Sequence, residues 1–198
     1  MIKLEQYRDE WLAENVSEFI GFYNREFFCL DNFSSFGFMY DGVYYQTVEH
    51  AYQSLRFKNI APEIEKKIIQ CYSAYEAQKI AYDNIDKQVP NWGTIKVLIM
   101  ENLLKAKLGQ NPYVKKKLLQ TKNYLICEDS PKDSFWGIGP DRNGQNQLGK
   151  LWMKLRDEIG NDNSSMGSVE MRLADGPFEK IKSGEKNVEI RLYDEKRR

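Results

Sequence analysis

The sequence predicts an α+β fold that is mainly α-helical, with one short β-hairpin and few strands. Apolar residues recur at helical spacing in several segments, which is typical of helices that pack against a core. By contrast, residues 36–46 contain two aromatic and β-branched runs on either side of Asp41-Gly42, a dipeptide that favours the type I′ turn of a hairpin. One further strand is expected at about 124–127.

The hairpin leads into a helix predicted at 47–57. Thr47 is a suitable N-cap, which places Glu49 in the first turn, where free backbone amides and the helix dipole favour a negative charge. We therefore expect Glu49 to be ionised near neutral pH. Gln53 and Arg56 follow Glu49 at i+4 and i+7 on one stripe, while a separate apolar stripe can face the core. The alternative is an ordinary amphipathic helix whose Glu49 and Arg56 are solvated.

Further helices are predicted at 61–71, 74–84, 93–108, 111–120 and 146–159. A glycine-punctuated loop, residues 136–146, precedes the last of them. Its glycines can expose backbone amides beside a helix N-terminus, an arrangement that suits a phosphate or another anion. The glycine spacing fits neither a dinucleotide-binding fingerprint nor a P-loop, so a connector without a ligand is an equal alternative.

Composition narrows the class of protein. The 198 residues carry a formal net charge of zero, so no global attraction to nucleic acid or to an anionic membrane is expected. The three cysteines are far apart and form no Cys-x-x-Cys pair, which argues against a disulfide framework or a zinc site. The start of the sequence lacks an apolar signal core, and no apolar run is long enough for a membrane span. These features together predict a soluble, cytoplasmic protein. Because His50 is the only histidine, carboxylates are the expected catalysts.

Composition also predicts the domain limits. After residue 159, residues 160–168 have the small, polar character of a linker, so a domain is expected to end there. Residues 169–198 are too few to bury an independent core. One domain with an appendage is therefore expected.

Several separated motifs resemble the NADAR family of YbiA-like N-glycosidases over residues 21–159. The matching segments, in order, are Phe22-Tyr23, Leu30-Asp-Asn-Phe33, Asp41-Gly42, Thr47-Val-Glu-His50, Tyr52-Gln53, Trp92 with Lys96 and Met100, Asp133-Ser-Phe-Trp-Gly137, and Gly144, Asn146, Leu148-Gly149 and Met153. Their order and spacing follow the family pattern. The resemblance implies the mainly helical fold of that family. It also implies that residues 21–159 form the main domain and that residues 1–20 are an N-terminal extension.

Two positions depart from the family pattern. The family commonly has Gln-x-x-Lys-Phe where this chain has Gln53-Ser-Leu-Arg56-Phe57, so a planar guanidinium replaces a compact ammonium. The family's Ala-x-x-x-Gly-Arg element is replaced by Ala77-Gln-Lys-Ile-Ala81-Tyr82, which lacks both the glycine and the arginine. We therefore expect the grip on phosphate or the choice of substrate to differ.

The resemblance implies hydrolysis of an N-glycosidic bond between ribose and a base-like amine. Ribosylaminopyrimidine phosphates of early riboflavin biosynthesis and ADP-ribose attached to guanine both carry such a bond. Its cleavage builds positive charge on the ribose, which an ionised carboxylate can stabilise, and it leaves an amine that must gain a proton. We assign the charge-stabilising role to Glu49 or Asp133, while the second carboxylate, His50 or Gln53 could supply the proton or contact the heterocycle. The two catalytic carboxylates, Glu49 and Asp133, must then converge around one sugar, and we expect no metal ion or other cofactor.

The other candidate residues are assigned to substrate binding. Trp136 and, more weakly, Trp92 and Tyr44 are candidates for stacking on the base. Arg56, Arg142 and the glycine loop are candidates for holding phosphate, since a guanidinium matches phosphate oxygens. Core packing of Trp136 and a surface ion pair of Arg142 are the structural alternatives. The full set expected to bind substrate is Asn32, His50, Gln53, Arg56, Trp92, Trp136, Gly137, Arg142 and Asn146.

Residues 169–198 resemble the opening of an ASCH domain, a small barrel related to RNA-binding PUA-like folds. The similarity rests on Pro177-Phe178 and on residues 183–186 and 188–194, and it stops before most of such a barrel. A truncated or remnant module is expected, with a disordered charged tail as the alternative.

The expected partner is a small ribosyl-amine or ADP-ribosyl substrate, and no membrane is expected. Two other functions stay open at this point. One is hydrolysis of ADP-ribosylated guanine in nucleic acid, which a complete ASCH domain would favour. The other is non-catalytic binding of ADP-ribose or a nucleotide.

Overall fold

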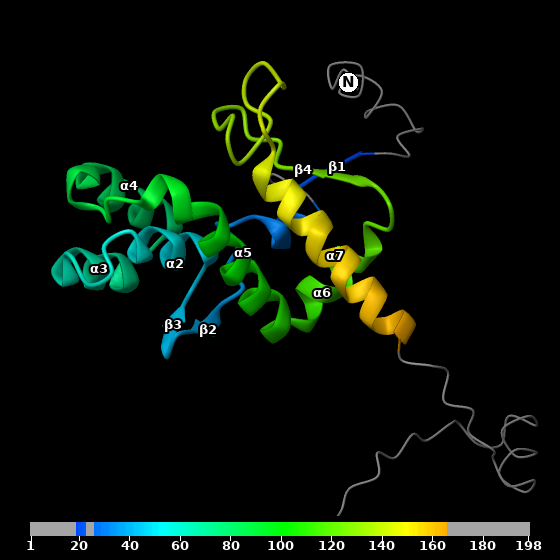
Figure 1. Cartoon of the computed structure of the whole chain (residues 1–198), viewed down its shortest axis with the longest axis horizontal. Coiled ribbons are helices and arrows are strands. Elements are labelled where there is room, and N and C mark those ends of the chain that lie inside the picture. The colour runs from blue at the N-terminus through cyan, green and yellow to red at the C-terminus, as the bar shows by residue number, and fades with distance from the viewer. Residues whose placement is uncertain (1–18, 23–25, 166–198) are drawn as a thin grey trace, which may run out of the picture. The chain divides into compact units, whose positions relative to one another are not determined.

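The computed structural model describes residues 19–22 and 26–165 (Figure 1), with side chains described for residues 20–22 and 26–160. Most of the expected N-terminal extension, Tyr23, the end of the expected linker and the whole ASCH-like segment lie outside the described residues. The predictions made for those parts of the chain therefore stay predictions.

The described residues form an α+β fold made mainly of helices, as the sequence predicts. The elements in order are β1 (Phe19–Gly21), the 3-10 turn η1 (Phe28–Leu30), β2 (Phe38–Tyr40), β3 (Val43–Tyr45), α2 (Val48–Leu55), α3 (Pro62–Gln70), α4 (Ala74–Asp83), η2 (Ile85–Lys87), α5 (Trp92–Gln110), α6 (Pro112–Gln120), β4 (Leu125–Cys127) and α7 (Gln147–Ser165). Figure 1 shows α2, α3 and α4 gathered together, with α5 running from them toward α6 and α7. Among the described residues, no helix combines the length and the apolar character needed to cross a membrane.

The predicted hairpin is confirmed. Strands β2 and β3 pair antiparallel, with Phe38 opposite Tyr45 and Tyr40 opposite Val43. The two turn residues Asp41 and Gly42 have φ angles of 51° and 76°. Both values are positive, as a type I′ turn requires. The hairpin ends two residues before α2 and so sets where that helix begins.

A second, two-stranded sheet was not predicted. Strand β1 pairs in parallel with β4, and Ile20 lies opposite Ile126. The pairing begins at Phe19, so the main domain reaches at least two residues before the predicted limit at 21. The pairing also fixes the end of β4, from which the chain continues directly to Glu128.

The predicted end of the last helix was too early. Helix α7 continues to Ser165, through residues 160–165 that were expected to belong to a linker. The packed face of the helix lies earlier, at Leu148, Leu151, Trp152 and Leu155. Adding residues to a helix that is already nucleated and anchored costs little, so polar residues of modest helix propensity can extend it.

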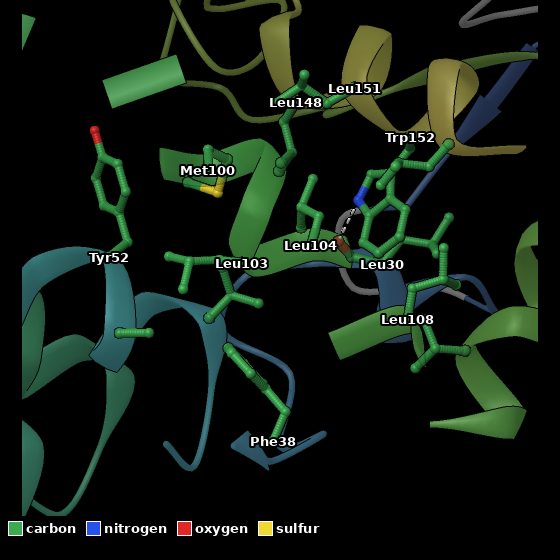
Figure 2. Close-up of a cluster of buried hydrophobic side chains, with 14 of the residues drawn as sticks. Leu30, Phe38, Tyr52, Met100, Leu103, Leu104, Leu108, Leu148, Leu151 and Trp152 are labelled. Atoms are coloured by element: carbon green, nitrogen blue, oxygen red, sulfur yellow. Dashed lines mark hydrogen bonds between the residues drawn. The ribbon is translucent and has the colours of Figure 1, made fainter. Parts of the chain in front are cut away.

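Helix α5 lies at the centre of the hydrophobic core. Its buried side chains, Met100, Leu103, Leu104 and Leu108, contact side chains of α7 and of the segment around Leu30 (Figure 2). Within this core, Trp152 Nε1 donates a hydrogen bond of 2.8 Å to the carbonyl oxygen of Leu30. A second buried cluster joins α3 to α4 through Ile64, Ile68, Ala77 and Ala81, among others. The two clusters hold in place the helices that carry the candidate site.

The close packing of α7 on β4 depends on Gly149. A Cβ atom at this position would lie 2.2 Å from the carbonyl oxygen of Ile126 and 2.6 Å from Asn146 Oδ1. Contacts this short cannot form without a shift of the backbone. Gly109, near the end of α5, has no atom within 4 Å of the corresponding point and so provides a matched comparison.

We predict that Gly149→Ala lowers the free energy of unfolding by about 1–3 kcal/mol, because the added methyl group overpacks the contact between α7 and β4. The same change at Gly109 should raise it by roughly 0.5–1 kcal/mol, since alanine costs less backbone entropy in a helix. Urea unfolding followed by circular dichroism measures both effects. Equal shifts for the two variants would contradict the packing role of Gly149.

Candidate active site

Helix α2 forms one wall of the candidate site. Thr47 has extended backbone angles, and its side-chain oxygen accepts a hydrogen bond from the backbone N–H of His50 at 3.2 Å, which confirms it as the N-cap. All eight residues of the helix are buried. Glu49 is only 4% exposed and Arg56, just after the helix, only 5%. The interpretation of an amphipathic helix with solvated Glu49 and Arg56 is therefore wrong.

A chain of hydrogen bonds connects the polar residues of this wall. Glu49 Oε1 accepts from Gln53 Nε2 at 2.7 Å and from Gln78 Nε2, on α4, at 3.3 Å. Gln53 Oε1 in turn accepts from Arg56 Nη1 at 2.7 Å. Arg56 also donates from Nε and Nη2 to Gln88 Oε1, at 3.0 and 2.8 Å. Gln53 and Gln88 thus both hold the guanidinium of Arg56 in place. Arg56 orients the side-chain amide of Gln53, and Gln53 in turn orients the carboxyl group of Glu49.

The protonation of Glu49 differs from the expectation. Burial raises the pKa of Glu49 to about 7, although the hydrogen bonds from Gln53 and Gln78 and the charge of Arg56 lower it. Desolvation of the charged form outweighs the first-turn position on which the expectation of full ionisation rested. Glu49 is therefore present in both protonation states near neutral pH.

Glu49 opens onto a cavity of about 350 Å³, called here the smaller cavity. It is formed by residues of α2, α4 and α5 together with the segment between η1 and β2, the segment at η2 and the loop after β4. The residues that line it are Asn32, Phe33, Glu49, Tyr52, Gln53, Arg56, Gln78, Tyr82, Ile85, Gln88, Trp92, Gly93, Lys96, Met100, Glu128, Asp133, Phe135 and Trp136. Glu49 and Asp133, which are distant in the sequence, therefore do converge on one cavity.

Asp133 also organises the loop that carries Trp136. Its Oδ1 accepts hydrogen bonds from the backbone N–H groups of Phe135 and Trp136, at 2.8 and 2.7 Å. The indole of Trp136 meets the ring of Tyr52 edge-on, with centroids 5.5 Å apart, and the ring centroids of Trp92 and Tyr52 are 5.0 Å apart. Trp136 and Trp92 thus form an aromatic wall of the smaller cavity, as the stacking assignment requires. Tyr44, the weaker candidate, is on the hairpin and does not line the cavity.

Glu128 lines the smaller cavity and was missed by the sequence reasoning. It follows β4 directly, and its Oε2 is buried without a hydrogen-bond partner among the described residues. Burial raises the pKa of Glu128 well above its usual range, and the nearby carboxylates of Asp31, Asp133 and Glu49 raise it further. Burial thus favours the protonated, neutral form of Glu128. A polar residue directly after an apolar strand is the signal that could have pointed to it.

Asn32 and Lys96 complete the polar lining. Asn32 was predicted, and its Oδ1 is also buried without a partner among the described residues. Lys96, from α5, lies with its Nζ 3.3 Å from the centroid of the Phe135 ring. It was recognised only as part of a motif, yet with Arg56 it supplies the positive charge of the lining. These two cations are the residues of the smaller cavity best suited to a phosphate group.

A buried lysine outside the cavity fixes the segment that carries Asn32. Lys107 Nζ donates to the carbonyl oxygen of Asp31 at 2.9 Å and to Ser34 Oγ at 2.8 Å. Burial lowers the pKa of Lys107 to about 7, against the opposing effect of Asp31. The lysine therefore ties α5 to the turn from which Asn32 and Phe33 enter the site.

His50 and Arg142 are not brought to the smaller cavity. The His50 ring is buried between Thr47 Oγ1 and the carbonyl oxygen of Cys71, at 2.9 and 3.3 Å, and desolvation lowers its pKa. It faces away from the lining because residues 49 and 50 point in different directions on a helix. Arg142 pairs instead with Asp129, with Nη2 3.6 Å from Oδ1, as the surface ion-pair alternative anticipated.

Asn146 and Gly137 line neither cavity; they contact the backbone of the segment that carries Glu128. Asn146 Nδ2 donates to the carbonyl oxygen of Ile126, and its Oδ1 accepts from the backbone N–H of Glu128. Gly137 lies so close to this segment that a Cβ atom would be 2.6 Å from the carbonyl oxygen of Glu128. Both residues thus fix the backbone that presents Glu128. Their assignment to direct substrate binding is not supported by this placement.

A larger cavity of about 740 Å³ adjoins the smaller one. The two share six lining residues, which are Phe33, Gln78, Tyr82, Glu128, Asp133 and Phe135. The larger cavity is lined in addition by Phe28, Asp31, Tyr75, Ser130, Pro131, Lys132 and Ser134. Within the described part of the chain, no group of three or more His, Cys, Asp or Glu side chains is arranged to hold a metal ion.

Comparison with known proteins identifies relatives of this chain. The model of the NADAR domain matches residues 8–160. The N-glycosidase Npun_R5314 of Nostoc punctiforme is 33% identical over 143 residues, which is 72% of this chain and 92% of that protein. The N-glycosidase YbiA of Escherichia coli is 29% identical over 128 residues, which is 65% of this chain and 79% of that protein.

Two further similarities concern a longer relative and a solved structure. The riboflavin biosynthesis protein VVA0006 of Vibrio vulnificus is 30% identical over 130 residues, which cover 66% of this chain but only 35% of that protein. The NMR structure of Escherichia coli YbiA superimposes with a TM-score of 0.70 at 25% sequence identity, over 80% of this chain and 96% of the YbiA chain.

Proposed function

Since this chain belongs to the NADAR domain family, we propose that it is an N-glycosidase that hydrolyses the bond between a ribosyl carbon and the amine of a heterocycle. The observation that carries the proposal is the convergence of Glu49, Glu128 and Asp133 on one cavity walled by tryptophans. Relatives named as N-glycosidases and as riboflavin biosynthesis proteins support it.

The environments of two carboxyl groups favour a division of labour between base and acid. Glu49, with a pKa of about 7, supplies a substantial carboxylate fraction that stabilises positive charge on the ribose and orients the attacking water. Glu128, whose pKa is also raised by burial and by the neighbouring carboxylates, donates a proton to the departing amine. Asp133 adds negative charge near the sugar while it holds the Trp136 loop. This scheme uses only side chains of the protein and needs no metal ion.

The cations of the smaller cavity favour a substrate with phosphate on its ribosyl group. Arg56 is already hydrogen-bonded to Gln53 and Gln88, so Lys96 has more freedom to contact phosphate oxygens. A ribosylaminopyrimidine phosphate and an ADP-ribosylated guanine both meet this requirement. The proposal includes both as substrate classes.

The proposal is tested by incubating the protein with a ribosylaminopyrimidine phosphate, with ADP-ribosyl-guanosine and with an ADP-ribosylated oligonucleotide. We expect chromatography to detect free base from at least one of them. Calorimetric binding of ADP-ribose with no base released over long incubation would instead establish a non-catalytic binding module, the second candidate that the Arg56 and Tyr82 departures favour. Release from the oligonucleotide alone would establish the nucleic-acid reaction.

We predict that the rate of base release rises with pH through about 7. Glu49 works as a carboxylate, and its pKa is about 7, so below that pH kcat/KM should fall by roughly tenfold for each pH unit. Loss of the Glu128 proton should lower the rate again at higher pH. Measuring kcat/KM across this range tests both limbs, and a rate independent of pH on both sides of 7 would contradict the role of Glu49.

A further inference from the structure

We propose that Lys107, which lines neither cavity, is a positioning residue for the candidate active site. It attaches residues 31–34, called here the Asp31 turn, to α5, and through this turn it fixes the side chain of Asn32 and the first turn of α2. The effect expected on turnover rests on the proposed glycosidase function. The effects expected on backbone order and on ligand binding do not.

The side chain of Lys107 extends from α5 and is completely buried. Its Nζ donates to two groups of the Asp31 turn, the carbonyl oxygen of Asp31 at 2.9 Å and Ser34 Oγ at 2.8 Å. The rings of Phe36 and Trp152 are its further neighbours, with centroids 5.7 and 5.9 Å from Nζ. Both hydrogen bonds of the ammonium therefore go to one short segment, and they join α5 to that segment.

The Asp31 turn can form without the lysine. Ser34 Oγ donates to the carbonyl oxygen of Asp31 at 2.7 Å, and the backbone N–H of Phe33 donates to Asp31 Oδ1 at 2.6 Å. A buried cation costs more free energy than an apolar side chain of similar length, because its desolvation is offset only by good hydrogen bonds. Stability therefore gives little reason for a lysine at position 107. What Lys107 adds is a fixed attachment of the turn to α5.

The Asp31 turn contacts the site at two points. The carbonyl oxygen of Asn32 accepts a hydrogen bond of 3.0 Å from the backbone N–H of Glu49. This N–H is in the first turn of α2, where the helix itself has no acceptor for it. The side chain of Asn32 lines the smaller cavity. A movement of the turn would therefore change both the backbone at Glu49 and the position of the Asn32 amide.

The side chain of Asn32 is left ready for a ligand. Its Oδ1 is buried without a hydrogen-bond partner among the described residues, and such an acceptor costs free energy until a donor completes it. A hydroxyl group of the ligand or a water molecule can supply that donor. Because a hydrogen bond weakens steeply outside a narrow range of distance and angle, the turn must hold Oδ1 in place before the ligand arrives. Lys107 provides that support from outside the cavity.

The test compares three variants. Lys107→Met keeps a long, flexible side chain that can fill the same space but removes the N–H donors. Lys116→Met makes the same change at an exposed position of α6 and is the matched control. Leu155→Ala removes packing from a buried position of α7 that lines neither cavity, so it controls for a general loss of stability.

Amide hydrogen exchange, followed by NMR on the full chain, measures the attachment directly. In Lys107→Met the exchange rate of the Glu49 N–H should rise by about tenfold or more, because the turn that carries its acceptor opens more easily. Amides in the packed part of α7 should change only as much as the global stability measured by urea unfolding. Lys116→Met should change neither. An unchanged Glu49 amide, or an equal rise throughout the helices, would overturn the proposal.

A double-mutant cycle with Asn32→Ala then tests the route to function. Lys107→Met should lower kcat/KM by about 10- to 100-fold when Asn32 is present, and much less when its side chain has been removed. Leu155→Ala should keep full activity below its unfolding transition. Additive losses would overturn the proposal, because Lys107 would then not act through Asn32. If the unchanged protein releases no base, the same cycle on the affinity for ADP-ribose, measured by calorimetry, gives the same decision.

Discussion

Replacing Glu49 with glutamine is expected to lower the rate of base release by about a thousandfold, a loss typical of removing a charge-stabilising or proton-transferring group. Glutamine has nearly the same shape, and its side-chain oxygen can still accept hydrogen bonds from Gln53 and Gln78. What it cannot supply is the negative charge that stabilises the ribosyl cation. The expected loss is therefore in kcat, with little change in the affinity for substrate.

The fold should survive this substitution, because it removes a buried ionisable group and retains the packing. Urea unfolding checks that point, and base release in a single turnover, followed by chromatography, measures the chemical step. Glu63→Gln, at an exposed position in the first turn of α3, is the matched control and should keep full activity. Turnover of Glu49→Gln at the rate of the unchanged protein would remove Glu49 from the mechanism.

The regular part of the fold could be predicted because each element has a strong local signal. The hairpin follows from Asp41-Gly42, whose positive φ angles few other dipeptides adopt at low cost. Pro62 and Pro112 occupy the first turns of α3 and α6, where proline loses no helical hydrogen bond. Each predicted helix is present within a few residues at its ends, except α7.

The parallel pairing of β1 with β4 has no comparable local signal. Each strand is three residues long, and the partners Ile20 and Ile126 are far apart in the sequence. Three residues cannot establish an alternating pattern, and only the packed core decides that these segments meet. For the same reason, the sequence did not indicate Glu128. Its place in the site depends on where the pairing of β1 with β4 puts the end of β4.

Within the site, the sequence located α2 and the residues on its polar stripe but not their environment. Gln78 and Gln88 come from other segments, and no spacing rule connects them with Glu49 or Arg56. The pKa of Glu49 likewise depends on burial by residues outside its own helix. Adjacent residues of one motif can also have different roles, one in the site and one in the fold. Glu49 faces the cavity, while His50 connects α2 to the segment at Cys71.

The second large effect is expected at Arg56. Arg56→Met leaves Gln53 Oε1 and Gln88 Oε1 without their donor, and the loss of a buried, charge-assisted hydrogen bond should lower kcat/KM by roughly 10- to 100-fold. Arg56 acts through Gln53, so it is a positioning residue. Its charge lowers the pKa of Glu49, so removing it should also move the acidic limb of the pH profile to higher pH.

Arg56→Lys separates the charge from the geometry. Lysine keeps the positive charge but cannot make the forked contact with Gln88 and the simultaneous bond to Gln53. We therefore expect a lower kcat with the acidic limb near its original position. If Arg56→Lys and Arg56→Met had the same rate and the same pH profile, the positive charge at position 56 would have no effect. That result would contradict the role assigned to the charge of Arg56.

Arg56 and Tyr82, the two departures from the NADAR pattern, contact each other, so we expect substitutions at the two positions to be coupled. The Arg56 guanidinium carbon lies 5.5 Å from the centroid of the Tyr82 ring. Tyr82 is the residue that the sequence resemblance aligns with the family's arginine. Tyr82→Arg alone would place two guanidinium groups side by side and should reduce activity. Combining it with Arg56→Lys restores the family pair and should recover most of the activity that the single variants lose. A double-mutant cycle measures this coupling, and purely additive losses would mean that the two departures are independent.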